Sequence, residues 1–236
     1  MNGERSHRLR IKFQKTGELR FLSHLDLVRA FERGARRADL PLSLTQGFSP
    51  HAKISFGPPL PVGVSSECEY VDIIIEERPE LKKIAVSLQA AFPADLSCNE
   101  VRYAEHASPS LMSLTSLGSY QIEASIEPQL APDEVKHILD SGSKEEELLL
   151  PAKDGDRAYE SRKILKKLTL ERVEPSGNKC LIQIGFLGLL PSAGGVRPDV
   201  LVKGLLSLGR PDVQVVFHKI HRTGLYYCED EKLVAP

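Results

Sequence analysis

Two periodicities alternate along this chain of 236 residues, and their order constrains the fold. Residues 8–13 (RLRIKF) alternate polar and apolar side chains, as in a half-buried strand. From Ser23 to Ala38 the apolar residues instead recur at spacings of three and four, which predicts a helix. The elements that follow are short strands at 42–44 and 53–56, a β-branched strand at 69–76, a helix over 79–92 and a strand at 96–103. The predicted order is βαββαβ.

The second half repeats this order more loosely. Its predicted elements are a strand at 120–126, a helix at 132–139, a short strand at 147–150, a long strand at 179–189, a helix at 197–208 and a strand at 213–220. Residues 141–170 are irregular. We therefore predict an α+β protein of two tandem ferredoxin-like (βαββαβ) units, one over residues 1–105 and a less regular one over 117–236.

Composition limits the classes of protein that this chain resembles. It is 41% hydrophobic, yet no run of about 18 apolar residues is present, so we expect no membrane span. The first residues lack the apolar core of a secretory signal, which favours the cytoplasm. Cys68, Cys98, Cys180 and Cys228 are far apart, and no pair of histidines has the spacing of metal ligands. We expect thiols within strands and no metal site.

Charge is unevenly distributed although the net charge is only -1. Residues 1–60 carry a net +6, residues 61–150 a net -11 and residues 151–236 a net +4. Two basic ends around an acidic middle suggest a surface for a polyanion, and ordinary solvated faces are the alternative.

The first predicted helix carries much of the N-terminal positive charge. Ser23 and Asp26 form a capping-box pattern, and Leu25, Val28, Phe31, Ala35 and Ala38 make the expected apolar face. Because a helix turns by about 100° per residue, four arginines fall on the opposite side: Arg29, Arg33, Arg36 and Arg37. We predict that they contact phosphates. His24 is expected to be a tucked, hydrogen-bonded histidine.

The loop from Thr45 to Pro61 is the second candidate. It contains glycines, prolines and four polar side chains, namely Gln46, Ser49, His51 and Lys53. Hydrogen-bonding groups without a nearby carboxylate suit phosphate or base recognition better than acid–base chemistry. The alternative is a wide hairpin turn with its own hydrogen bonds.

Three further basic segments lie in the second half. Arg197 follows a Gly-Gly pair at a predicted helix start, where backbone N–H groups favour anions, although a plain connection explains it as well. Residues 219–227 (KIHRTGLYY) interleave basic and aromatic side chains, a composition that holds phosphates and stacks bases; we single out Lys219, His221, Arg222 and Tyr226. The basic cluster Arg162, Lys163, Lys166 and Lys167 lies in a segment, 161–170, that fits either a short helix or the entry to a strand, and we interpret the cluster as a solvated face.

Residues 19–73 (LRFLSHLDLV… to …CEYVDI) and the segment KIHRTGLYY resemble the bacterial radical SAM-linked protein family, a domain of unknown function found beside or fused to radical SAM proteins. The resemblance implies a partner that carries the iron–sulfur cluster and SAM, and no cofactor in this chain. It brings no catalytic residue.

The resulting expectation is an RNA-binding accessory protein that acts with a radical SAM enzyme on tRNA or rRNA and is not catalytic by itself. One alternative is a metal-independent ribonuclease using His51 or His221. Another is a module that docks the radical SAM partner without RNA contact. The sequence does not predict the oligomeric state.

Overall fold

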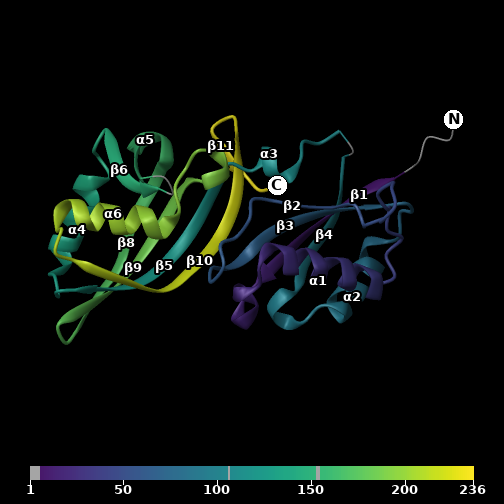
Figure 1. The fold of residues 1–236 in the computed structure, drawn as a ribbon, viewed down its shortest axis with the longest axis horizontal. Helices are drawn as coiled ribbons and strands as arrows, with labels where there is room; N and C mark the ends of the chain where they lie inside the picture. Colours follow the sequence, from purple (N-terminus) through teal and green to yellow (C-terminus); the bar gives the residue numbers. More distant parts are fainter. Residues whose placement is uncertain (1–5, 106, 153–154) are drawn as a thin grey trace. The chain divides into compact units, whose positions relative to one another are not determined.

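The structure, a computed structural model, describes residues 6–105, 107–152 and 155–236 (Figure 1). The chain divides into two compact units. Unit 1 runs to Thr115 and includes Pro236, and unit 2 is Ser116–Ala235. Each combines antiparallel strands with helices, which confirms the predicted α+β class. No helix of the described residues has the length and apolarity needed to cross a membrane.

Unit 1 contains four sheet strands in the order β4-β1-β3-β2, all paired antiparallel. Helix α1 follows β1 and helix α2 follows β3. The bounds are β1 His7–Lys15, α1 His24–Arg37, β2 Ile54–Phe56, β3 Ser65–Ile75, α2 Leu81–Ala91 and β4 Cys98–Ala104, with short helices η1 Gly17–Phe21, η2 Ala94–Leu96 and α3 Leu111–Leu114.

Alternation along the strands fills the core of unit 1. Leu9, Ile11 and Phe13 on β1 are at most 1% exposed and belong to one cluster with residues of α1 and α2. Aromatic rings join these elements: the Phe31 ring lies 4.6 Å from that of Phe13 and 4.8 Å from that of Phe92. The sheet face that carries these residues is therefore the one that the two helices cover.

Helix α1 begins as predicted, but its buried face is rotated. The Asp26 N–H donates to the Ser23 hydroxyl oxygen, and that hydroxyl donates to the Asp26 carboxylate. The buried residues are Leu27, Phe31, Gly34, Ala35 and Ala38, whereas Leu25 is 58% exposed. Leu25 and Leu27 both fit a helical period, and only packing against the sheet selects between them.

Unit 2 has the strand order β10-β5-β9-β8, again antiparallel, with β11 beside β10. Helices α4 and α6 lie over one face of this sheet (Figure 1). The bounds are β5 Leu117–Glu127, α4 Pro132–Gly142, β6 Glu147–Ala152, β7 Gly155–Glu160, α5 Ser161–Ile164, β8 Leu165–Ser176, β9 Lys179–Leu189, α6 Pro198–Gly209, β10 Gln214–Glu229 and β11 Lys232–Val234.

The second half differs from the prediction in its strands: β7, β8 and β11 were not predicted. The strand expected at 147–150 is β6, which pairs only with β7 in a separate hairpin. Its Leu148 and Leu150 are fully buried, and Leu150 lies where a side chain at Gly204 of α6 would stand. The strand beside β9 is instead β8, which begins in the segment interpreted as irregular. Tandem ferredoxin-like units stay a prediction.

Candidate functional site

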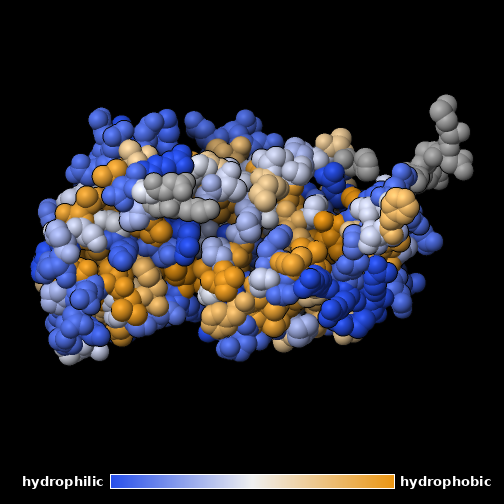
Figure 2. Space-filling view, in the orientation of Figure 1, coloured by the Kyte–Doolittle hydropathy of each residue, from blue (hydrophilic) through white to orange (hydrophobic). Residues whose placement is uncertain are grey.

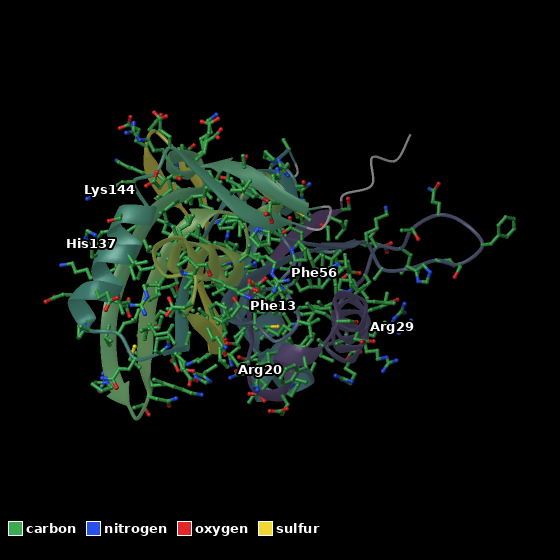
Figure 3. The ribbon with its side chains drawn as sticks, turned by 60° about the vertical axis from the view of Figure 1, so that its left-hand side comes forward. Phe13, Arg20, Arg29, Phe56, His137 and Lys144 are labelled. Atoms are coloured by element: carbon green, nitrogen blue, oxygen red, sulfur yellow. The ribbon has the colours of Figure 1, made fainter. Side chains whose placement is uncertain are left out.

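Helix α1 exposes all four predicted arginines to solvent, Arg29, Arg33, Arg36 and Arg37, and we call the first three the arginine face. Arg33 is exposed and has no hydrogen-bond or ion-pair partner within the described parts of the chain. Arg29 is 58% exposed, 3.5 Å from Asp26, and points away from unit 1 in Figure 3. Arg36 is 54% exposed and 2.9 Å from Glu32. Figure 2 shows strongly hydrophilic atoms next to hydrophobic ones in the region of α1.

Arg37 is also exposed, but unlike the other three it has a backbone partner outside α1 among the described residues. Its guanidinium donates a 2.7 Å hydrogen bond to the carbonyl of Ala91, the last residue of α2. A cation at a helix C-terminus satisfies an unpaired carbonyl and interacts favourably with the helix dipole. Arg37 therefore joins α1 to α2.

The loop after α1 forms a narrow two-stranded ribbon over residues 43–53. The Lys53 N–H donates to the Ser43 carbonyl (2.9 Å), and the Thr45 N–H donates to the His51 carbonyl (2.8 Å). The His51 N–H in turn donates to the Thr45 hydroxyl (3.0 Å). The hairpin alternative is thus what the backbone adopts, and the ribbon extends outward from unit 1 in Figure 3.

The polar residues predicted for this loop lie on the ribbon. Gln46, Ser49 and His51 are exposed, while Lys53 is half-buried at the base. The Ser49 hydroxyl is 3.3 Å from the His51 ring Nε2. The ribbon therefore offers hydrogen-bonding groups that are held by its own turn.

Phe48 is the residue that sequence reasoning missed. It stands at the tip between Gly47 and Ser49, with its side chain fully in solvent at 112% relative exposure. Gly47 has a φ of 135°, a conformation that favours glycine, so the tip turn depends on it. The available signal was an aromatic residue inside a polar glycine-containing turn, where no core would use it.

Glu32 connects the arginine face to the ribbon. The Arg36 hydrogen bond is the main cause that lowers the pKa of Glu32, and the Ala52 backbone N–H and the nearby His51 lower that pKa further against partial burial. The carboxylate therefore stays ionised between the helix and the base of the ribbon.

The predicted residues of unit 2 do not gather at one point. Strand β10 is extended there, so Lys219 and His221 lie on one face of the sheet and Arg222 on the other. Lys219 is 3.7 Å from Glu123. Arg222 is 1% exposed, and its Nε donates to the Tyr120 hydroxyl (3.1 Å), which corrects its prediction as a phosphate ligand.

The structure also shows the surroundings of three other predicted residues, Arg197, Tyr226 and His24. Arg197 forms two hydrogen bonds with Asp199 (3.1 and 2.7 Å), so its charge is compensated at the start of α6. Tyr226 is half-buried on β10. His24 is exposed rather than tucked, and its ring centroid lies 5.4 Å from that of Phe56 in a T-shaped arrangement.

None of the four cysteines, all within the described residues, forms a disulfide, and only some are in the core. Cys68 and Cys180 are buried, whereas Cys228 is exposed, contrary to the prediction. Burial raises the pKa of Cys98 to about 12. Within the described residues no cluster of three or more His, Cys, Asp or Glu side chains has the geometry to hold a metal ion.

Comparison with known proteins adds a family and a fold. The sequence profile of a family described as "Uncharacterized protein conserved in bacteria" matches residues 8–198. This chain belongs to that family, DUF2344. No curated protein matches the chain at a significant level.

Solved structures resemble this DUF2344 member in fold. A chain of "Crystal Structure of a Cbf5-Nop10-Gar1 Complex" has a TM-score of 0.51 and 14% identity over 94% of this chain and 50% of that one. A chain of "Crystal structure of the archaeal box H/ACA sRNP Nop10-Cbf5 complex" has a TM-score of 0.45 and 13% identity over 91% and 46%. The chain spans about half the length of these neighbours, and the likeness concerns the fold alone.

Proposed function

We propose that this protein binds single-stranded RNA through unit 1, with the arginine face holding phosphates and the ribbon contacting bases. One observation carries the proposal: a fully exposed Phe48 lies at the tip of a ribbon whose base touches a helix with three solvent-facing guanidinium groups. Because the Phe48 ring is fully exposed to solvent, it does not contribute to the core of unit 1.

The chemistry of these groups fits a single strand. Guanidinium groups bind phosphate oxygens, and aromatic rings stack on bases that are not paired. Arg33 is the strongest phosphate ligand because no protein carboxylate competes for it within the described residues. Arg29 exchanges a weak exposed ion pair for a phosphate at little cost. Arg36 has further N–H donors for a phosphate beside its hydrogen bond with Glu32.

The biological setting follows from the sequence resemblance and is part of the same proposal. The protein acts as an accessory to a radical SAM enzyme in tRNA or rRNA modification, and the partner supplies the iron–sulfur cluster and SAM. Each unit is a ferredoxin-like βαββαβ unit, an interpretation that the strand orders β4-β1-β3-β2 and β10-β5-β9-β8 support.

Salt dependence tests the phosphate contacts. If the three guanidinium groups of the arginine face bind phosphates, the log–log slope of affinity against salt is about -2, from roughly -0.7 per contact. Arg33→Gln is expected to reduce this slope by about 0.7. Lys136→Gln, which removes one exposed positive charge from α4, is the matched control. Identical slopes for Arg33→Gln and the natural protein would contradict the arginine face as the phosphate site.

Phe48→Ala tests the base contact. Loss of one stacked base costs about 1–3 kcal/mol, so the affinity for labelled single-stranded RNA is expected to fall by about 5- to 150-fold. The thermal stability is expected to stay unchanged because Phe48 makes no core contact. Phe21→Ala, which removes another exposed phenylalanine of unit 1, is the control. Equal affinities would rule out stacking at the tip.

The same samples separate the two other functions. RNA incubated with the protein in EDTA is expected to remain intact; cleavage that is lost in His51→Ala would instead show a ribonuclease. If Arg33→Gln abolishes capture of a radical SAM protein and leaves RNA affinity unchanged, the face docks an acidic protein surface.

A further inference from the structure

The helix-free face of the unit 2 sheet contains a hollow of about 290 Å³. This volume is close to the lower limit of small-ligand sites, which is about 300 Å³. Ile122, Ile184 and Phe186 are at most 3% exposed, as expected of residues on the sheet face over which α4 and α6 lie. Strand alternation therefore places their neighbours Gln121 and Gly185 on the opposite side, where the hollow lies.

Strand register explains why the sheet is hollow at this point. Gly185 pairs with Gln121 on one side and Thr169 on the other, so the middle of this row has no side chain. A glycine inside a strand often marks a place where a ligand approaches the backbone closely. The neighbouring row, Lys167–Leu187–Ser119, forms the next wall.

A β-bulge directs a carboxylate over the same point. Leu170 pairs with Ile184 and Arg172 with Gln183, so Glu171 is the extra residue of the bulge. Its Oε1 lies 2.7 Å from the position that a Cβ of Gly185 would take. Bulges re-aim side chains and are frequent beside binding sites. Glu171 thus leans over the floor of the hollow.

Two oppositely charged side chains line the hollow and can bind a ligand. Lys167 and Glu171, both described residues that line it, form no ion pair with one another. Gln121 adds an amide that both donates and accepts, and Leu187 and Tyr226 add apolar surface. A ligand for this set is planar, apolar on its faces, and has both donors and acceptors on its edge.

We infer that this hollow binds a guanine base, as a second contact for the RNA strand; the inference rests on the proposed function for its biological ligand. Among the four RNA bases, guanine offers adjacent N1–H and N2–H donors to one carboxylate, here Glu171. Its O6 and N7 acceptors suit an ammonium such as that of Lys167. Adenine, cytosine and uracil lack this donor pair.

The test measures binding of GMP, AMP, CMP and UMP to the full-length protein by ligand-detected NMR or calorimetry. GMP is expected to bind at least about tenfold more tightly than the other three, since a bidentate contact contributes about 1–3 kcal/mol of discrimination. Glu171→Gln and Lys167→Met are expected to lower the GMP affinity about tenfold or more, and Gly185→Leu to abolish binding by filling the hollow. Glu174→Gln and Lys166→Met, neighbours on β8 that do not line the hollow, are the controls.

The outcomes separate this inference from the proposed function. Equal affinity for all four nucleotides, no nucleotide binding, or no effect of Glu171→Gln overturns the guanine site, while a response of RNA affinity to Arg33→Gln still supports unit 1. Conversely, guanine binding that depends on Glu171, together with RNA affinity that ignores Arg33 and Phe48, supports the hollow and contradicts the arginine face. Because Glu171 and Lys167 are surface residues, their variants test the inference even if Gly185→Leu does not fold.

Discussion

Asp72→Ala is expected to destabilise unit 1 strongly, because Asp72 is one half of a buried ion pair. Arg10 and Asp72 are directly opposite on β1 and β3. The Arg10 guanidinium donates two hydrogen bonds to the carboxylate, at 2.7 and 2.8 Å, and both side chains are 3% exposed. The variant leaves a guanidinium in a site closed to water.

Two estimates of the cost agree. Two hydrogen bonds to charged groups contribute about 1.5–3 kcal/mol each, or about 3–6 kcal/mol together. Removal of one partner of a buried pair costs about 3–5 kcal/mol, since the other charge stays uncompensated. Arg8, at 4.0 Å from Asp72, adds little to this sum.

Hydrogen exchange with mass spectrometry is the suitable assay because it reports each unit separately and the chain has no tryptophan. A loss of 3–5 kcal/mol accelerates exchange of the most protected β1 and β3 amides by about 10²–10⁴-fold. Strand β9 in unit 2 is an internal reference. Glu174→Ala, which breaks an exposed pair with Arg172, is the control and should change stability by less than about 1 kcal/mol.

The double variant Arg10→Met/Asp72→Leu completes the cycle. Apolar replacement of both members of a buried pair is often neutral or stabilising, so most of the lost protection should return. If Asp72→Ala leaves β1 and β3 exchange unchanged, the pair contributes no net stability and the reasoning is wrong.

Three other predictions concern local contacts. Gly34→Ala is expected to lower the melting temperature, because the added Cβ would lie 2.2 Å from the Phe92 ring. Overpacking costs about 1–3 kcal/mol, which exceeds the gain in helix propensity of about 1 kcal/mol. A higher melting temperature would contradict this. Arg36→Met is expected to raise the pKa of Glu32, measured by carbonyl NMR, because the Arg36 hydrogen bond is the main cause that lowers it. On acidification, the contact between the Glu32 carboxylate and the ribbon is then lost at a higher pH. An unchanged pKa would refute the assigned cause. Cys98, with a pKa raised to about 12, should react with iodoacetamide at pH 8 at least about a hundredfold more slowly than in the unfolded chain, and comparable rates would show that it is not shielded.

Local signals were sufficient for much of the fold. The cap formed by Ser23 and Asp26 involves residues three apart, so it was readable from the sequence. Strand β9 was predicted with its exact bounds because residues 179–189 form a long apolar run. The segment that begins β8 was left open between a short helix and a strand, since bulges break the alternation on which such predictions depend.

In the candidate sites, too, some features follow from local sequence and others from packing and strand register. Arg33 and Arg37 occupy similar places on a helical projection, but only the packing of α2 against α1 gives Arg37 a carbonyl partner. Glu171 and Gly185 are 14 positions apart and carry no shared motif; the register of β8 on β9 brings them together.

The sequence by itself determined the class of the fold, the order of most elements and the positive charge of α1, because these depend on periodicity, capping and composition over a few neighbouring residues. The tertiary structure alone decided which arginine of α1 bonds to the neighbouring helix, where Phe48 stands and where the unit 2 sheet is hollow. Those features depend on the register and packing of strands and helices that are distant in the chain.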